Sequence, residues 1–364
     1  MGLLRTLLAI SVVFAHSDWH NSYVFVGGRN AVRAFYMISG YLMSYILLNT
    51  PIYKDNLVFY KSRAFRIYPI YFVVLAVSLL ARVVSGPAYF HAWSNFPGFC
   101  ATALIVSNIA IVGQDWLMFT AVKDGKFGLS ANFQNSNPPV YTGLLIPPAW
   151  TLGLELTFYA IAPFVMRRRP LLWLLLVLSL SAWAAFSIAQ PTLSRQDPWT
   201  YRFFPFELSL FLLGSLSHQL LYERVAKLKN IKPLAAGVTA GAILFCLVFS
   251  ELPLSELARA TALTILLFGS LPFLFIFQDQ HRLDRMIGEI SYPLYLSHLV
   301  VIDTIGHFTK RLHVYSALGS AILNVVVSLL VACLLNALVA KPLETMRQAM
   351  KQREARKAAP SAAA

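Results

Sequence analysis

Long runs of hydrophobic residues recur along almost the whole chain, and short polar segments separate each run from the next. A helix that crosses a membrane needs about 20 consecutive apolar residues, because the hydrocarbon core of a bilayer is about 30 Å thick. Most of the runs reach the lower limit of about 17 residues for such a crossing. The pattern therefore predicts an all-α protein, a polytopic bundle of transmembrane helices.

About ten spans are expected from the runs that approach the length of a bilayer crossing. They cover residues 3–19, 31–49, 67–85, 144–165, 171–189, 202–220, 233–250, 257–277, 286–306 and 315–339. The stretch 99–113 is apolar but short, so we predict a short intramembrane or re-entrant segment there. A pair of crossings, with the second around 114–130, is the alternative. The Asn- and Pro-rich stretch 131–139 is expected to be an extracytoplasmic loop.

Residues 1–345 are predicted to form one membrane domain, without an internal repeat or an appended soluble domain. The remaining segment, 346–364, is first basic and then rich in alanine. Segments of low hydrophobicity and high charge bury too little apolar surface to fold alone. We therefore predict a disordered cytoplasmic tail.

Composition agrees with a membrane protein, since 57% of the residues are hydrophobic and only 13% are charged. Soluble domains carry about 25% charged residues. The net charge is +14, and the basic residues gather in the polar segments 61–66, 167–169, 222–232 and 341–357. Because lysine and arginine concentrate in cytoplasmic loops, this distribution predicts cytoplasmic N- and C-termini. It does not indicate nucleic-acid binding.

The first predicted span carries Arg5 and His16. Eleven residues of helix return to about the same face, so both side chains lie on one side of the helix, about 16 Å apart. A neutral imidazole suits general-base chemistry, and a packing histidine is the alternative. His16 and His20 also have the spacing of a metal-binding pair, with Asp18 between them, but no third ligand is evident. No metal site is predicted.

Arg63 and Arg66 stand at the start of the third span, three residues apart. Residues at this spacing are neighbours on a helix surface, so two guanidinium groups face the same way. Arginine binds phosphate oxygens in pairs. The two residues therefore suit a phosphate or pyrophosphate group, and a simple topological anchor is the alternative.

The segment WTLGLELTFY, residues 150–159, places Glu155 inside an apolar helix. A charged side chain at the bilayer centre costs about 2.5–3.5 kcal/mol. Because Pro147 and Pro148 precede this helix, Glu155 is expected a turn or so below the outer surface, where it faces a polar cavity. A structural carboxylate paired with Arg33 or Arg202 is the alternative.

Two further motifs place small or polar residues inside predicted spans. Ser39 and Gly40 form a small pair, which marks close helix packing. Ser291, Tyr295 and His298 form one polar stripe along a helix. Such a stripe could line a substrate channel or form hydrogen bonds between helices.

Taken in this order, the motifs resemble those of the bacterial membrane acyltransferase-3 family, over about residues 2–345. Its members transfer acyl groups to sugars and other hydroxyl-bearing acceptors. The matching segments are RTLLAISVVFAH (5–16), FYMISGYLM (35–43), SRAFRIYP (62–69), WTLGLELTFY (150–159) with Pro163, and ISYPLYLSH (290–298). Many members carry an aspartate a few residues before the Ser-Gly pair, where this chain has Arg33. No role is transferred to that position.

The resemblance implies a membrane O-acyltransferase in the bacterial inner membrane. It uses acyl-CoA, with acetyl-CoA as the expected donor, and no metal. Its expected acceptor is a surface glycan or glycolipid, with a separate periplasmic acyl-handling partner as a further option. We predict His16 and Glu155 as catalytic residues, Arg5, Arg63 and Arg66 as donor-binding residues, and Trp150, Tyr159, Ser291 and His298 as substrate-binding residues. The alternative function is a proton-coupled secondary transporter or a flippase for an acyl group or lipid.

Overall fold

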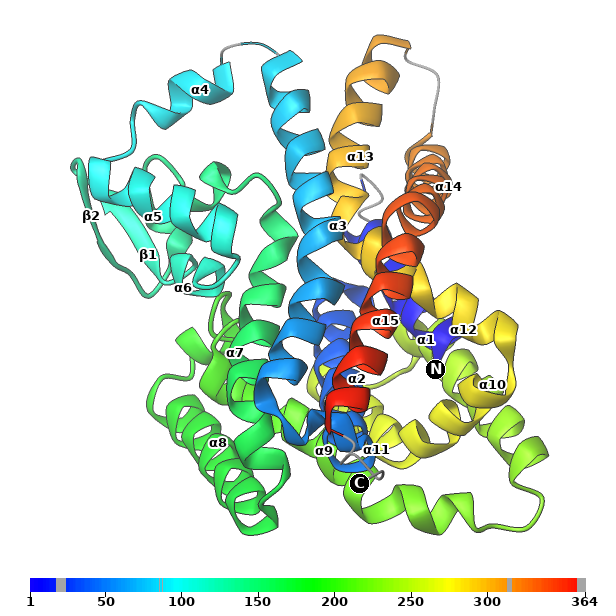
Figure 1. Ribbon diagram of the computed structural model, residues 1–364. Helices are drawn as coiled ribbons and strands as arrows, with labels where there is room; N and C mark the ends of the chain where they lie inside the picture. Colours follow the sequence, from blue (N-terminus) through cyan, green and yellow to red (C-terminus); the bar gives the residue numbers. More distant parts are fainter. Residues whose placement is uncertain (18–23, 85, 87, 313–315, 359–364) are drawn as a thin grey trace.

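The protein is a bundle of long helices (Figure 1), seen in a computed structural model that describes residues 1–17, 24–84, 86, 88–312 and 316–358. Its longer helices are α1 (Gly2–His16), α2 (Gly27–Asn49), α3 (Asn56–Val84), α5 (Gly98–Ala110), α7 (Trp150–Met166), α8 (Arg169–Ala189), α9 (Phe204–Ala226), α10 (Ile231–Val248), α11 (Glu256–Gln280), α13 (Ser291–Leu312), α14 (Ala317–Leu335) and α15 (Lys341–Ala358). Short elements are α4 (Ala88–Trp93), α6 (Gln114–Leu117), α12 (Arg282–Glu289), β1 (Thr120–Lys123) and β2 (Lys126–Leu129). The predicted all-α polytopic bundle is confirmed.

Seven helical stretches among the described residues are long and apolar enough to cross a membrane. They contain α2, α3, α7, α8, α10, α11 and α14. Many large apolar side chains on them point outward; on α8, for example, Leu174 is 55% and Val177 56% exposed. Exposed apolar surface of this extent marks contact with lipid. The predicted total of about ten crossings stays a prediction.

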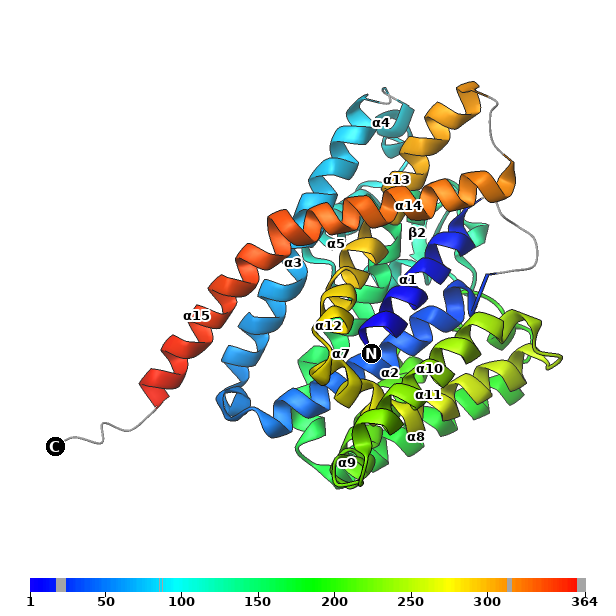
Figure 2. The same ribbon diagram turned by 90° about the vertical axis from the view of Figure 1, so that its right-hand side faces the viewer.

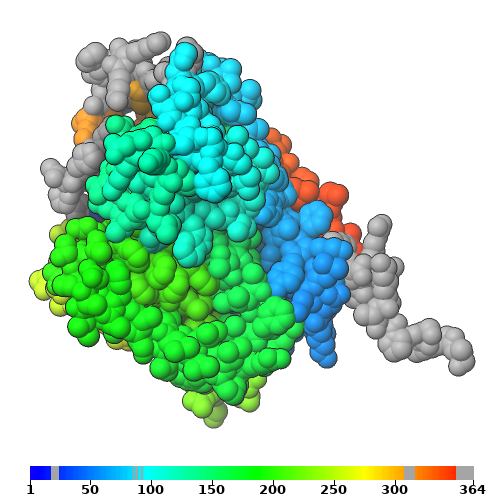
Figure 3. All heavy atoms as spheres, turned by 90° about the vertical axis from the view of Figure 1, so that its left-hand side faces the viewer, coloured from blue at the N-terminus to red at the C-terminus, as the bar shows by residue number. Residues whose placement is uncertain are grey.

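The segment between α3 and α7 contains no second long helix among its described residues. The predicted short segment 99–113 forms α5, whose 13 residues span only about 20 Å. The pair of crossings considered as an alternative is therefore absent from residues 88–143. Instead the chain forms an antiparallel hairpin of β1 and β2. Figure 3 shows this unit, in cyan and blue-green, above the green surface of α7 and α8.

The hairpin was not predicted, although its turn has a recognisable sequence. Asp124 and Gly125 join the strands, with φ angles of 49° and 72°. A two-residue turn with both φ angles positive matches the twist of paired strands and favours Asp-Gly. The Asp-Gly pair was therefore the available signal.

The centre of the bundle is the crossing of α2 and α9, the most extensive helix contact in the described structure. A Cβ atom on Gly40 would lie 1.9 Å from the carbonyl oxygen of Phe211, and one on Gly214 1.9 Å from that of Met37. The Ser215 hydroxyl donates to the Gly40 carbonyl at 3.0 Å. The Ser39-Gly40 pair thus marks a close helix contact, as predicted, and it holds the helix that carries Ser39 in place.

The last predicted span and the tail form one continuous helical rod. A π-helical turn at Asn336–Ala340 joins α14 to α15, and π turns are frequent at functional sites. Figure 2 shows α15 running beside the lower part of α3. The tail predicted to be disordered from residue 346 is helical as far as Ala358. The helix α15 contacts α3, and Arg347 is buried there.

Candidate active site

Two cavities in the described part of the bundle are lined in part by α13. The inner cavity, of about 290 Å³, is lined by Ser291, Tyr292 and Tyr295 from the first turns of α13. The outer cavity, of about 460 Å³, is lined by α13 from Leu296 onward. The start of α7 is also shared between the cavities. Pro147, just before this helix, lines the outer cavity, and Thr151, in its first turn, lines the inner one. The two cavities share no lining residue among those described.

Arginine side chains dominate the charge of the inner cavity. Arg5 comes from α1, Arg63 and Arg66 from α3, and Arg347 from α15. Glu155 is the one carboxylate among the described residues that line it. None of Arg5, Arg63 and Arg66 forms an ion pair within the described part of the chain. A cavity with this excess of fixed positive charge is suited to an anionic ligand.

Glu155 is held by hydroxyl groups. Ser39 donates a hydrogen bond to its Oε1 at 2.7 Å, and Tyr159 donates a second one to the same oxygen. The close α2 contact described above therefore fixes one of its two partners. Glu155 faces a polar cavity and not lipid, as expected, but this is the inner cavity that Arg63 and Arg66 also line. The predicted position, a turn or so below the outer surface, is wrong.

The predicted alternative partners of Glu155 are paired elsewhere. Arg33 lies 3.3 Å from Glu207, and Arg202 donates to Asp197 at 2.8 Å. The alternative pairing of Glu155 with either arginine is therefore wrong. Asp197 is only five residues before Arg202, and Glu207 lies on α9 against α2, so each arginine meets a nearer carboxylate.

The ring of Trp150, at the start of α7, packs against the guanidinium group of Arg202. The guanidinium carbon of Arg202 lies 4.1 Å from the centre of its ring, a cation–π contact that holds the indole in place. One turn later, Gly153 makes room for the buried side chain of Asp115, whose Oδ1 would lie 2.7 Å from a Cβ atom there. Burial raises the pKa of the Asp115 carboxyl to about 6. The glycine of the WTLGLE segment thus accommodates a neighbouring carboxyl group.

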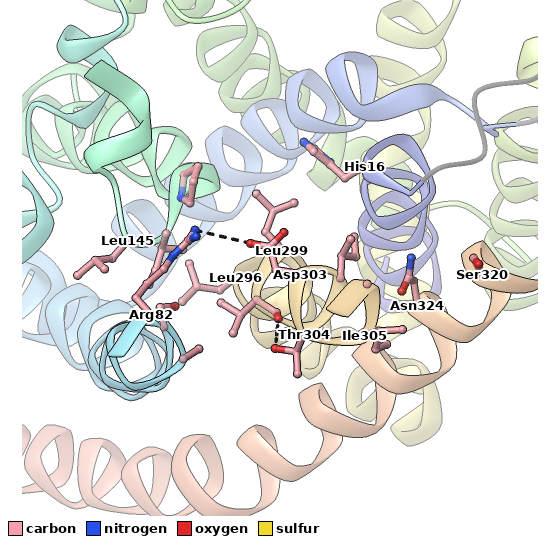
Figure 4. A pocket seen from close by; sticks show the side chains of 17 residues that line it. His16, Arg82, Leu145, Leu296, Leu299, Asp303, Thr304, Ile305, Ser320 and Asn324 are labelled. Carbon is pink, nitrogen blue, oxygen red and sulfur yellow. Dashed lines mark hydrogen bonds and ion pairs between the residues drawn. The ribbon is translucent and has the colours of Figure 1, made fainter. Parts of the chain in front are cut away.

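His16 ends α1 and lines the outer cavity, as Figure 4 shows. Its Nδ1 lies 2.9 Å from the carbonyl oxygen of Val12. Because a carbonyl only accepts, Nδ1 carries the proton and the lone pair is on Nε2. Opposite, Arg82 of α3 and Asp303 of α13 form an ion pair of 3.6 Å across the cavity. The geometry therefore presents a basic nitrogen to a cavity with polar walls.

A second histidine stands directly behind the first. The ring centres of His16 and His298 are 5.0 Å apart. His298 is fully buried, and its Nδ1 lies 2.6 Å from the Tyr295 carbonyl oxygen. Its Nε2 has no hydrogen-bond partner among the described residues. Buried polar atoms are rarely left unpaired, so this nitrogen is available to a water molecule or a substrate group.

Tyr295 connects the histidine pair to the inner cavity. Its ring centre is 5.9 Å from that of His298, and Thr151 donates a hydrogen bond to its hydroxyl at 3.1 Å. The polar stripe predicted along this helix thus divides between two places. Ser291 and Tyr295 line the inner cavity, while His298 lines neither cavity and packs against His16.

The structure brings most of the predicted site residues into the inner cavity. Those that line it are Arg5, Arg63, Arg66, Glu155, Tyr159 and Ser291. His16 lines the outer cavity, so it does not meet Glu155, and Trp150 and His298 line neither cavity. His20 and Asp18 lie outside the described residues. Within the described chain, no group of three His, Cys, Asp or Glu side chains is placed to hold a metal ion.

Among the charged residues described as lining the inner cavity, Arg347 is the one that the sequence did not predict. It belongs to the charged segment that was expected to be disordered, and a charge run of this kind is usually solvated. An available signal was the position of Arg347 three residues after Glu344, a helical spacing that favours an ion pair.

Comparison with known proteins identifies a protein family that this chain matches. Residues 1–340 match the family model described as an acyltransferase domain. A protein named nodulation protein 10, from Rhizobium leguminosarum bv. viciae, is 26% identical over 324 residues, covering 83% of this chain and 82% of that protein. An uncharacterised protein from Aquifex aeolicus is 22% identical over 221 residues, covering 58% of this chain and 93% of its own length. No solved structure matches.

Proposed function

The chain belongs to the acyltransferase-3 family of membrane acyltransferases, and from this we propose that it moves an acyl group, expected to be acetyl, from acyl-CoA to a hydroxyl of a cell-surface glycan or glycolipid. The observation that carries this proposal is the inner cavity, in which four arginines face one carboxylate among the described residues. Coenzyme A is a multiply phosphorylated donor, and guanidinium groups bind phosphate oxygens in pairs.

Donor and acceptor are proposed to enter from opposite sides of the membrane. The inner cavity lies next to the basic segments 61–66 and 341–357, which the positive-inside rule assigns to the cytoplasm. Acyl-CoA is therefore proposed to bind from the cytoplasm, with the protein in the bacterial inner membrane. The acceptor then occupies the outer cavity, beside His16.

The chemistry proposed for His16 is general-base catalysis. Its Nε2 takes the proton of the acceptor hydroxyl while the hydroxyl oxygen bonds to the acyl carbon. The carbon–sulfur bond of the thioester breaks, and the thiolate takes the proton from the imidazolium. The acyl end of the donor reaches His16 past Tyr295, whose hydroxyl is bonded to Thr151 at 3.1 Å.

The direct test is acyl transfer by the purified protein in detergent. Labelled acetyl-CoA is incubated with the full chain and a pool of glycans and glycolipids extracted from the producing bacterium. Label is expected in a hydroxyl ester of one acceptor, released by mild alkali. Binding of acetyl-CoA without transfer to any acceptor in the pool would argue for another use of the donor, and absence of binding would exclude the donor itself.

Removing one arginine of the inner cavity should weaken binding of the acyl donor without changing binding of the acceptor. Arg66→Ala is expected to raise the KM for acyl-CoA about tenfold, the effect of losing a hydrogen bond to a charged group, and to leave the KM for the acceptor unchanged. Steady-state kinetics with each substrate varied in turn measures both. Arg224→Ala is the matched control, since Arg224 is exposed in the basic segment 222–232 and does not line the cavity. An unchanged KM for acyl-CoA would show that Arg66 does not bind the donor and acts only as a topological anchor.

His298 is expected to act by positioning His16. His298→Gln keeps a polar side chain of similar length but removes the ring that packs against His16 at 5.0 Å. We expect kcat to fall about 10- to 100-fold, the loss typical of a residue that orients a reacting group. The KM for acyl-CoA should stay the same. If kcat is unaffected, the ring only fills space beside His16.

A further inference from the structure

Arg347 lies beyond residues 1–340, the part of the chain that matches the family. It belongs to α15, which follows the π turn at Asn336–Ala340 and packs against α3. The side chain is only 9% exposed and lines the inner cavity together with Arg63 and Arg66. A charged side chain is rarely buried to this degree unless it is paired or binds a ligand.

Ser62 holds Arg347 beside Arg63. Nη1 of Arg347 and Nη2 of Arg63 both donate to the Ser62 hydroxyl, each at 3.4 Å. The same hydroxyl lies 2.9 Å from that of Tyr53. Two guanidinium groups from different helices are thus brought to one oxygen atom, although their charges repel each other. A shared anionic ligand would relieve that repulsion.

Both guanidinium groups keep a free donor. The Nε atoms of Arg347 and Arg63 are buried and have no hydrogen-bond partner among the described residues. Buried donors without a partner are unfavourable, so both guanidinium groups would gain by turning these N–H groups toward an oxygen of a ligand in the cavity.

Glu344 already occupies one edge of Arg347. Nη2 of Arg347 donates to its Oε1 at 2.6 Å, and Gln348 donates to the same oxygen at 3.2 Å. Glu344 is 40% exposed, whereas Arg347 is almost enclosed. The carboxylate therefore stands on the more open side of the guanidinium group, while the buried Nε has no partner among the described residues.

We infer that Arg347 is a binding residue for a phosphate group of the acyl donor, completing with Arg63 and Arg66 a site built from two helices. The inference rests on the proposed function, and it assigns to α15 the task of closing the donor site. The ligand chemistry is a phosphate ester with more than one phosphate, as in coenzyme A. A phosphate of an anionic lipid headgroup shares this chemistry, and the experiment separates the two.

The test measures CoA binding to the full chain in nanodiscs of neutral lipid, by calorimetry. Arg347→Ala is expected to weaken CoA binding about tenfold or more, because a charged hydrogen-bond pair to phosphate is lost. Arg347→Lys should recover part of the loss, since lysine supplies the charge without the paired donors. Glu344→Gln should tighten binding a few-fold because it removes a negative charge from the same site, and Arg224→Ala should change nothing.

The opposite sign of the two variants separates binding from helix docking. If the ion pair only docks α15, Arg347→Ala and Glu344→Gln should weaken CoA binding alike, and that result overturns the inference. Equal CoA binding by Arg347→Ala and the unaltered protein also overturns it. An effect of Arg347→Ala seen only in nanodiscs with phosphatidylglycerol would assign the site to a lipid headgroup instead. If the unaltered protein binds no CoA, the proposal that acyl-CoA is the donor is wrong, and the inference about Arg347 fails with it. If Arg347→Ala does not fold, the comparison of Arg347→Lys with Glu344→Gln decides.

Discussion

Replacing His16 with alanine is expected to lower acyl transfer by about 10²- to 10⁴-fold, the usual contribution of a general base. In the structure Nδ1 of His16 is committed to the Val12 carbonyl at 2.9 Å, so the basic Nε2 is the atom that the substitution removes. The loss should appear in kcat, with the KM for acyl-CoA unchanged, because the arginines of the inner cavity are untouched. Steady-state kinetics of acetyl transfer in detergent measures both quantities.

Folding has to be controlled in the same experiment. His16→Ala should elute as a monodisperse species and bind CoA as the unaltered protein does, since His16 lines the other cavity. His281→Ala is the matched control, because His281 stacks on Phe277 at the end of α11, outside both cavities. Transfer by His16→Ala at the normal rate would remove His16 as the base and leave the outer cavity without one.

The second large effect is expected on assembly of the bundle. A Cβ atom at Gly40 or at Gly214 would lie 1.9 Å from a backbone carbonyl oxygen of the facing helix, far inside van der Waals contact. A carbonyl in the middle of a helix has little room to move, so α2 and α9 must separate. We expect each substitution to alanine to destabilise the protein by about 3 kcal/mol, at the upper end for overpacking, and to prevent monodisperse purification when combined.

Gly241→Ala on α10 is the matched control. It is also a helical glycine, but a Cβ atom there would meet nothing within 4 Å. Alanine in a helix is favoured over glycine by about 0.5–1 kcal/mol, so this variant should unfold at an equal or higher temperature. Thermal unfolding followed by the fluorescence of a thiol-reactive dye compares the three variants. Equal unfolding temperatures for Gly40→Ala and Gly241→Ala would show that the α2–α9 contact can relax.

The locations of several site residues could be predicted from the sequence, because the spacing of residues along a helix determines which face of the helix they share. Arg63 and Arg66 are three residues apart, and both line the inner cavity. Glu155 could be placed in a cavity because lipid offers a carboxylate no partner. The contact at Gly40 was expected because only small residues let two helices touch. In each case the local sequence pattern is enough for the prediction, because it does not depend on which distant residue lies opposite.

Other features depend on contacts between distant segments, which spacing does not encode. Arg347 looks like a solvated charge until α15 is seen to pack on α3. Arg33 could have met Glu155, but the α2–α9 crossing brings Glu207 to it first. The division of the site into two cavities depends on where α13 runs through the bundle. His298 therefore lines neither cavity, although its stripe suggested a channel lining.

The wall formed by α13 also has an electrical consequence. One cavity on each side of a membrane would form a conducting pore if the two met, and each charge that crosses 100 mV dissipates about 2.3 kcal/mol. Leu294 and Leu296, both fully buried, place hydrocarbon on either side of Tyr295, where the lining formed by α13 changes from the inner to the outer cavity. If the protein acts as proposed, an uncharged acyl group is what crosses this layer, while the layer insulates the cell against leakage of its ion gradients.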